Sequence, residues 1–310
     1  MTEPTRGPRP ATWRDLRARA EAALREAGVA SPEAEARWLV VEVSGWSAPE
    51  LALAGDEPAT ARGGMRLEEL LERRCAGEPL QYVLGSWSFR GIELMVDRRV
   101  LVPRPETEVT AEVAVEEAQR LGARRGAPDP WSGAATSYVV ADLGTGSGAL
   151  ALALAAELPD AAVWATDVSE DALAVAGANL AGAGLPATRI RLALGSWFGA
   201  LPTSLRGGLR LVVSNPPYVA ESEVADLPRE VVDHEPIEAL VAGPNGLEAV
   251  EAILAEAGDW LEADGTVVCE LAPHQAEPAV ERALDAGFVE AFVRPDLSGR
   301  PRVLVARRRG

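Results

Sequence analysis

Apolar residues in the second half of the chain form short continuous runs, and most of these runs are followed by a stretch with helical spacing. Strands made of continuous apolar residues are typical of a sheet that is covered on both faces. Their alternation with helices indicates a mostly parallel sheet, because parallel strands need crossover connections. The predicted strands are 138–142, 162–167, 189–194, 209–214, 266–271, 288–294 and 303–306, and the predicted helices are 148–158, 169–180, 247–261 and 275–286.

The first part of the chain has the pattern of short helices instead. Thr12 and Asp15 have the spacing of a capping box, and Pro32 suits the first turn of a helix. Leucines at helical spacing give 66–76 one apolar face, and Gly77 ends that helix. These signals predict a helical domain before the α/β part.

A change of period separates the two parts. From Trp87 to Val96 apolar residues alternate with others, and Arg90-Gly91 interrupts them as a turn would, which predicts a β-hairpin. A later interruption at 123–137 is rich in Gly, Ala, Pro and Arg and is predicted to be a loop. The expected parts are a helical domain at 1–84, a β-hairpin linker at 85–105 and an α/β domain at 106–310.

Composition removes several kinds of chemistry. The chain has 310 residues, and its 47 acidic and 30 basic side chains give a formal net charge of -17, which argues against a general nucleic-acid binder. Every basic side chain is an arginine, so Schiff-base chemistry and a P-loop lysine are excluded. Cys75, Cys269, His234 and His274 are isolated in the sequence, and no usual metal-site spacing occurs.

Signals for export are missing from the sequence. Its apolar runs are shorter than the roughly 18 residues of a membrane span, and the N-terminal residues contain no apolar signal region. Two distant cysteines fit a reducing compartment. We therefore expect a cytoplasmic protein without membrane attachment.

A glycine-rich turn, Asp142-Leu143-Gly144-Thr145-Gly146-Ser147-Gly148, follows the first strand of the α/β part. Its glycines let a ligand approach the backbone, and the next helix presents free N–H groups. Such a turn serves a dinucleotide, an adenosyl cofactor or only a tight connection. Asp167 ends the next strand, where a carboxylate either accepts hydrogen bonds from ribose hydroxyls or caps a helix. Because the spacing G-x-G-x-G differs from the dinucleotide pattern, we favour S-adenosylmethionine.

The loop Ser214-Asn215-Pro216-Pro217-Tyr218 follows the strand at 209–214. The carboxyl ends of strands in a doubly wound sheet form the ligand crevice, so this loop is expected to face the glycine-rich turn. The side-chain oxygen of Asn215 and the carbonyl of Pro216 can together accept both hydrogens of an –NH2 group. Tyr218 offers a flat surface to a planar substrate. We predict that Asn215, Pro216 and Tyr218 are catalytic and that Pro217 completes the substrate site; the alternative is an ordinary turn.

Motif by motif, the chain resembles the HemK-type (PrmC) family of peptide chain release factor glutamine methyltransferases. The similarity covers most of the chain from about Gly77. It includes Leu101 to Glu108, Asp142 to Gly148, Asp167, Trp197-Phe198, Asn215 to Tyr218, Glu235-Pro236, Gly246-Leu247 and Asp296 to Gly299. Ser196 stands where many relatives carry an acidic residue.

The resemblance implies a Rossmann-like S-adenosylmethionine-dependent methyltransferase sheet, mostly parallel with an antiparallel last strand, and a small N-terminal helical domain that recognises the protein partner. It implies methyl transfer from S-adenosylmethionine, with S-adenosylhomocysteine as product, to the glutamine amide of the Gly-Gly-Gln motif in release factors. The implied cofactor-binding residues are Gly144, Thr145, Gly146, Ser147, Gly148, Asp167, Trp197 and Asn215, and the implied substrate-binding residues are Asn215, Pro216, Pro217 and Tyr218.

Two other functions remain open at this point. Asn-Pro-Pro-Tyr also suits the planar amines of adenine N6 and cytosine N4, so a nucleic-acid methyltransferase is the main alternative. Such an enzyme must extract its base and hold phosphates, which the net charge of -17 disfavours. The other is a non-catalytic binding protein that kept the fold, which the presence of both Asn215 and Asp167 disfavours.

Overall fold

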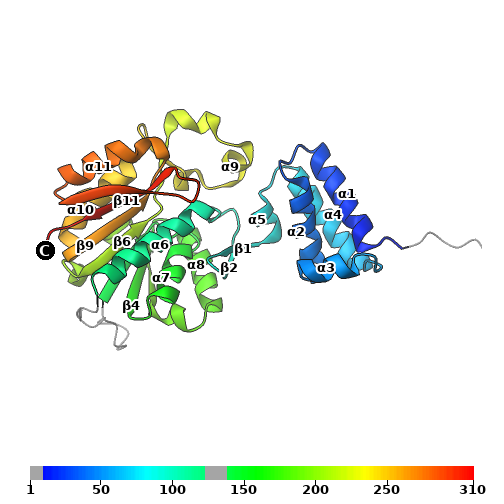
Figure 1. Cartoon of the computed structure of the whole chain (residues 1–310), viewed down its shortest axis with the longest axis horizontal. Coiled ribbons are helices and arrows are strands. Elements are labelled where there is room, and N and C mark those ends of the chain that lie inside the picture. The colour runs from blue at the N-terminus through cyan, green and yellow to red at the C-terminus, as the bar shows by residue number, and fades with distance from the viewer. Residues whose placement is uncertain (1–9, 123–137) are drawn as a thin grey trace, which may run out of the picture. The chain divides into compact units, whose positions relative to one another are not determined.

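The computed structural model describes residues 10–122 and 138–310, so the loop predicted at 123–137 lies outside the described residues. The chain divides into two compact units, Met1–Gly85 and Ser86–Gly310 (Figure 1). The hairpin belongs to the second of these units. Each unit has its own apolar core.

The first unit is a small helical domain. Helix α1 (Trp13–Glu26) begins at the predicted capping box, in which Thr12 Oγ1 accepts the Asp15 N–H and the Asp15 carboxylate accepts the Thr12 N–H. The other helices are α2 (Pro32–Ser44), α3 (Ala48–Ala54), α4 (Ala61–Cys75) and α5 (Leu80–Leu84). Helix α4 begins earlier than predicted because Thr60 Oγ1 caps it by accepting the Gly63 N–H.

The second unit is built on a seven-stranded sheet. In spatial order its strands are β10 (Glu290–Pro295), β11 (Pro301–Arg307), β9 (Leu261–Glu270), β6 (Leu209–Ser214), β3 (Tyr138–Leu143), β4 (Ala161–Asp167) and β5 (Ile190–Leu194). Strand β11 is antiparallel to both of its neighbours, and the pairs from β9 to β5 are parallel. The predicted sheet with an antiparallel last strand is confirmed. The strand order reverses at β3, which opens a ligand crevice at its carboxyl end.

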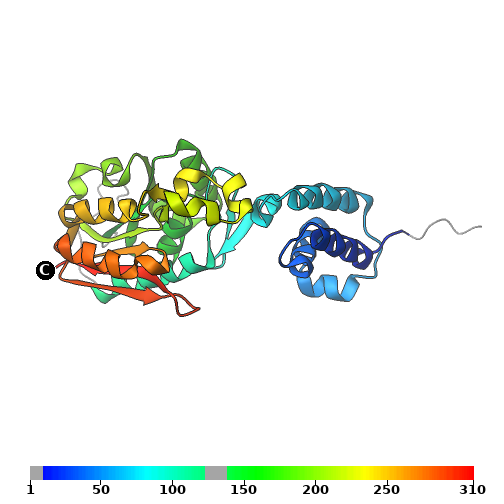
Figure 2. The ribbon, with the colours of Figure 1, turned by 90° about the horizontal axis from the view of Figure 1, so that it is seen from above.

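Helices cover both faces of this sheet (Figure 1). Helices α6 (Pro105–Arg120), α7 (Ala149–Glu157) and α8 (Glu170–Gly182) lie on one face. Helices α10 (Glu248–Trp260) and α11 (Ala276–Asp285) lie side by side on the other (Figure 2). Apolar residues of α10 and α11 form one buried cluster with the strands, and apolar residues of α6, α7 and α8 are buried on the other face. Cover on both faces explains why the inner strands are mostly apolar.

The predicted hairpin is formed by β1 (Ser86–Phe89) and β2 (Ile92–Met95). Asn179 of α8 holds β2 against the glycine-rich turn. Its Oδ1 accepts the Met95 N–H at 2.7 Å, and its Nδ2 donates to the carbonyls of Met95 and Ser147 at 3.1 and 2.8 Å. One buried amide therefore connects the hairpin to the crevice.

Between β6 and α10 the chain makes an excursion that the sequence pattern did not predict. It contains β7 (Val219–Ala220), α9 (Arg229–His234) and β8 (Val241–Gly243), and β7 pairs with β8 in parallel. These elements are too short to show a period, and prolines interrupt them.

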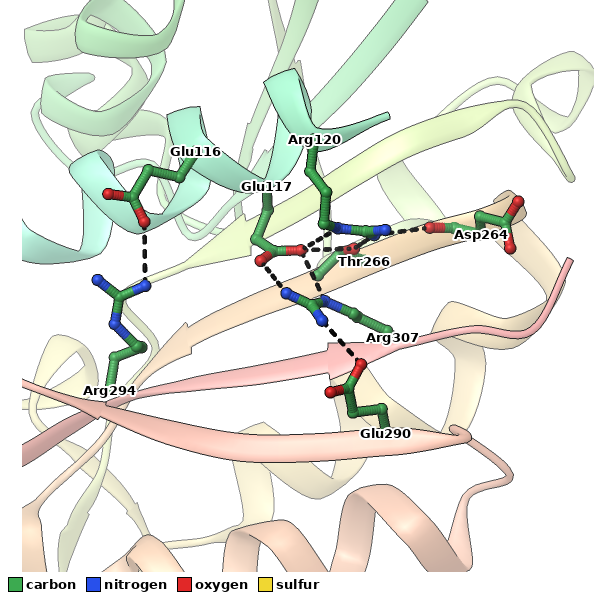
Figure 3. Close-up of polar contacts among 8 residues, drawn as sticks. All are labelled: Glu116, Glu117, Arg120, Asp264, Thr266, Glu290, Arg294 and Arg307. Atoms are coloured by element: carbon green, nitrogen blue, oxygen red, sulfur yellow. Dashed lines mark hydrogen bonds and ion pairs between the residues drawn. The ribbon is translucent and has the colours of Figure 1, made fainter. Parts of the chain in front are cut away.

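Helix α6 is fastened to the sheet by a network of charges (Figure 3). The buried Glu117 carboxylate accepts hydrogen bonds from Arg120 at 2.9 Å and from Arg307 of β11 at 2.6 Å. Arg307 also donates to Glu290, and Arg120 to Thr266. Burial alone would raise the pKa of Glu117, but the hydrogen bonds from the two arginines outweigh it and lower that pKa. The carboxylate is therefore ionised and holds α6 at a fixed place on the sheet.

Candidate active site

A cavity of about 540 Å³ lies at the carboxyl ends of β3, β4 and β6, where the strand order predicts a ligand site. This volume is typical of a small-molecule site. Of the predicted residues, those that line it are Gly144, Thr145, Gly146, Ser147, Asp167, Trp197, Asn215 and Pro217. The structure thus brings together residues from four separate segments of the sequence.

The glycine-rich turn keeps its shape through its own backbone. The N–H groups of Gly144 and Thr145 both donate to the Thr166 carbonyl, at 2.9 and 2.8 Å. Gly144 has φ +73°, and a Cβ there would lie 3.6 Å from the ring of Trp197. A side chain at this position would be strained and would also project toward the wall of the cavity. Gly148, the last residue of the turn, stands at the N-terminus of α7.

Asp142 supports the turn from below. Its Oδ2 accepts hydrogen bonds from the Thr145 hydroxyl at 2.6 Å and from the Ala151 N–H at 3.0 Å. The side chain is fully buried, and this burial raises the pKa of Asp142 to about 7. Thr145 and Asp142 are therefore occupied with each other, which leaves the backbone of the turn to face the cavity.

This raised pKa predicts a specific pH dependence of stability. The folded protein binds a proton at Asp142 that the unfolded chain, with a carboxyl of ordinary pKa 3.8, releases. The stabilisation is complete below the unfolded pKa and is lost as pH rises through the folded value. We expect the free energy of unfolding of the wild type, relative to Asp142→Asn, to fall by roughly 2–3 kcal/mol between pH 5 and pH 8. Urea unfolding at both pH values measures it; a constant difference between the two proteins would contradict the assignment.

Asp167 lies at the end of β4, as predicted. Its Oδ2 accepts the Gly146 N–H at 2.9 Å and its Oδ1 accepts the Ser169 N–H at 3.0 Å. The cap of α8 is Ser169, whose hydroxyl accepts the Ala172 N–H at 3.1 Å. Because a carboxylate has about four acceptor positions, Asp167 fixes the turn and still has capacity for the two hydroxyls of a ribose.

Trp197 forms a wall of the cavity from a strained position. It begins a short 3₁₀ helix that follows β5, and its φ of +43° lies in the left-handed region that few residues other than glycine adopt. Its neighbour Phe198 is fully buried against Trp260. This anchor at Phe198 helps to hold Trp197 in place over the turn.

Asn215 presents the clearest unsatisfied group in the cavity. Its Nδ2 donates to the Thr107 hydroxyl at 3.1 Å. Its Oδ1 is buried and has no hydrogen-bond partner among the described residues. Leaving a buried acceptor unpaired costs about 1–3 kcal/mol, which a hydrogen bond from a bound ligand would recover.

Pro216 and Tyr218 lie outside the lining of the cavity, to which Asn215 and Pro217 contribute. Pro216 is buried, and neither it nor Tyr218 is among the residues that line the cavity. The Tyr218 hydroxyl contacts Glu270 Oε1 at 3.5 Å. Burial raises the pKa of Tyr218 and also that of Glu270, where hydrogen bonds from Thr107 and Thr110 oppose it. The tyrosine is therefore a neutral donor toward a buried carboxyl.

The excursion after β7 reaches the cavity through Pro236, Glu238 and Ala239. Arg104 donates to both oxygens of the neighbouring Glu235, at 2.6 and 2.8 Å. Glu235 is buried, and burial raises its pKa against the opposing effect of Arg104. This ion pair joins Arg104, from the segment Leu101 to Glu108, to Glu235, from the segment Glu235-Pro236, across 131 residues of sequence.

Three polar residues of the site were given no role from the sequence: Thr107, although it lies in the segment Leu101 to Glu108, Asn179 and Glu270. Thr107 lies in the first turn of α6, a helix that the proline-rich sequence concealed. Pro105 followed by acidic residues is a helix-start signal that would have predicted that turn. Asn179 and Glu270 gave no such signal, because their partners are distant in the chain.

A doubly wound sheet with one reversed strand, a glycine-rich turn at the switch point and a carboxylate after the next strand define an S-adenosylmethionine-dependent methyltransferase. Family models agree, since the PrmC N-terminal domain matches residues 15–85 and the methyltransferase small domain matches residues 134–243. The chain belongs to the release factor glutamine methyltransferase family. Two proteins of that name are 40% identical to it: one from Deinococcus radiodurans over 96% of this chain and 99% of its own length, and one from Gloeobacter violaceus over 84% and 85%.

Solved structures agree on the fold. The hMettl16 catalytic domain in complex with MAT2A 3′UTR hairpin 1 superposes with a TM-score of 0.54 at 16% identity, over 87% of this chain and 90% of that chain. In the part of the chain that the structure describes, no helix has the length and apolar character of a membrane span. The same described residues contain no group of three or more His, Cys, Asp and Glu side chains arranged to hold a metal ion.

Proposed function

We propose that this enzyme transfers the methyl group of S-adenosylmethionine to the side-chain amide nitrogen of the glutamine in the Gly-Gly-Gln motif of peptide chain release factors. The observation that carries the proposal is the buried, unpaired Oδ1 of Asn215 in a cavity shared with the glycine-rich turn. A lone acceptor at that place favours a substrate with N–H donors. Membership of the family supplies the class of substrate.

The cavity residues suit the cofactor in three places. Backbone groups of Gly144 to Gly148 would hold the methionine end, the Asp167 carboxylate would accept the ribose hydroxyls, and Trp197 would cover the adenine. When bound, S-adenosylmethionine supplies an electrophilic sulfonium methyl group. The unused acceptor positions on Asp167 and the open space beside Gly146, where an added Cβ would meet no atom within 4 Å, support this fit.

The residues of the loop would position the substrate amide. An amide nitrogen is a poor nucleophile because its lone pair is delocalised, so catalysis depends on orientation and on stabilising the positive charge that develops. Asn215 Oδ1 and the Pro216 carbonyl would accept the two N–H groups. Pro217 would line the site, and Tyr218 would support the plane of the amide. The nitrogen loses one proton as it gains the methyl group, and that proton passes to solvent, so no dedicated base is required.

The helical unit is proposed to recognise the release factor, in keeping with its match to the PrmC N-terminal domain. The domain limits proposed from the sequence, 1–84, 85–105 and 106–310, assign recognition to the first part and catalysis to the last. We propose further that the enzyme works in the cytoplasm, where translation ends, and that it contacts no nucleic acid directly.

The test is a transfer assay with a labelled methyl donor. The protein is incubated with purified release factors, and the modified peptide is located by mass spectrometry. We expect one added methyl group on the glutamine of Gly-Gly-Gln, and none on a release factor in which that glutamine is replaced by alanine. Label that appears on DNA or RNA but not on a release factor would assign the enzyme to adenine N6 or cytosine N4 instead. Absence of cofactor binding would reduce it to a scaffold.

A further inference from the structure

The side chain of Asn215 has two ends of nearly equal shape and opposite hydrogen-bonding character. The Nδ2 end only donates and the Oδ1 end only accepts. A rotation of the amide by half a turn would therefore present two N–H groups to a substrate that itself offers N–H groups. The activity depends on which end faces the cavity, so a neighbouring group must select it.

Thr107, which also lines the cavity, contacts the Nδ2 end of this amide. Its hydroxyl lies 3.1 Å from Asn215 Nδ2, and its side chain is 4% exposed. By itself a hydroxyl does not select an orientation, because it can donate one hydrogen or accept at its lone pairs. Thr107 selects one orientation of the Asn215 amide only if its hydroxyl hydrogen is donated to another acceptor.

Glu270 uses that hydrogen. Its carboxyl accepts Thr110 at Oε2, 3.2 Å, and Tyr218 at Oε1, 3.5 Å. Thr107 lies one turn before Thr110 on α6, and hydrogen bonding from its hydroxyl is among the effects that oppose the raised pKa of Glu270. With its single hydrogen directed to Glu270, Thr107 has only lone pairs to offer Asn215. A lone pair attracts Nδ2 and repels Oδ1, so one orientation of the amide is stable.

We propose that Thr107, oriented by the buried Glu270, is a positioning residue that fixes the Asn215 amide with Oδ1 toward the substrate nitrogen. The chain of contacts runs from Glu270 at the end of β9 through Thr107 in the first turn of α6 to Asn215 after β6. It ends at Asn215 Oδ1, which no group among the described residues satisfies. The inference rests on the proposed function, because it concerns the substrate amide of that same site.

Thr107→Val tests the proposal, since it keeps the shape of the side chain and removes the hydroxyl. We expect kcat for methylation of a release factor to fall by about ten- to a hundredfold, the effect of losing the selection at one buried polar group. The KM for the release factor and the Kd for S-adenosylmethionine, measured by calorimetry, should change less than threefold, as roughly expected when a group acts only after binding.

Two further variants separate orientation from damage to the fold. Thr107→Ser retains a hydroxyl and should recover most of the rate. Thr110→Val removes a different hydroxyl from the same carboxyl, leaves the contact between Thr107 and Asn215 in place, and should retain more than about half the rate. The decisive measurement is the double variant Thr107→Val with Asn215→Ala, which should transfer methyl no more slowly than Asn215→Ala alone.

The results separate a failure of the role inferred for Thr107 from a failure of the proposed function. An active wild type with an equally active Thr107→Val overturns the inference and leaves the proposed function standing. The inference also fails if Thr107→Val weakens cofactor binding as much as it slows transfer, or if the two losses multiply in the double variant. A wild type that methylates no release factor overturns the proposed function, and the inference falls with it.

Discussion

Asn215→Ala is expected to slow methyl transfer to a release factor by about 10²–10³-fold, which is the usual effect of removing one preorganised hydrogen-bonding group from an active site. The variant loses the only side-chain acceptor that the loop directs into the cavity from the end of β6. It keeps the glycine-rich turn and Asp167, so the affinity for S-adenosylmethionine should fall less than about tenfold. Single-turnover transfer with labelled cofactor measures the first quantity, and calorimetry measures the second.

A matched control is Asn245→Ala. Asn245 is exposed, and its side chain contacts Glu248 and does not line the cavity. This variant should keep a rate close to that of the wild type. Near-wild-type turnover by Asn215→Ala would remove the proposed role of the loop, whatever the control does.

Gly246→Ala is expected to lower both activity and stability. A Cβ at this residue would lie 2.6 Å from the Tyr218 carbonyl oxygen, 2.6 Å from Gln275 Nε2 and 3.1 Å from the Ala220 N–H nitrogen. Gln275 donates to the carbonyls of Tyr218 and Gly246 at 2.8 and 3.0 Å and so joins the loop to the turn before α10. The methyl group would displace the Tyr218 carbonyl, and with it the loop that carries Asn215.

The expected loss of stability is about 2–4 kcal/mol, the sum of left-handed strain at φ +78° and of crowding in a packed site. The rate of transfer should fall at least about tenfold, because small displacements of a positioning group are costly. Gly207→Ala is the control, since Gly207 has φ +69° with no atom within 4 Å of the added Cβ. Thermal unfolding and kcat are compared for both, and equal losses in the two variants would show that crowding at Gly246 is unimportant.

The apolar pattern was sufficient for the sheet, because the inner strands β3, β4 and β6 are buried on both faces and are therefore mostly apolar. It was sufficient for the motifs at Asp167 and Asn215 as well, since the carboxyl ends of parallel strands meet at one edge. It failed where local sequence carries a mixed signal. Two prolines, Pro103 and Pro105, make the segment before α6 resemble a linker, yet Pro105 begins a helix.

The partners of the site residues were beyond sequence analysis for a different reason. Thr107 and Asn215 are 108 residues apart, and Tyr218 and Glu270 are 52 apart. Their contacts follow from the order of strands in the sheet and from the face on which α6 packs, neither of which a local pattern contains. The same is true of Gly246, whose sequence neighbours give no indication of the carbonyl that approaches it.

The charge network around Glu117, toward the C-terminal end of α6, limits how far this helix can tilt and so how far Thr107 can move. Thr107 and Glu117 are ten residues apart on this helix, or about 15 Å along its axis. A tilt of only about 5° around Glu117 would shift Thr107 by about 1 Å, which is comparable to the displacements that slow enzymatic reactions severely. Arg307, which lies toward the amino ends of the parallel strands, thus helps to fix the position of Thr107 beside the cavity at their carboxyl ends.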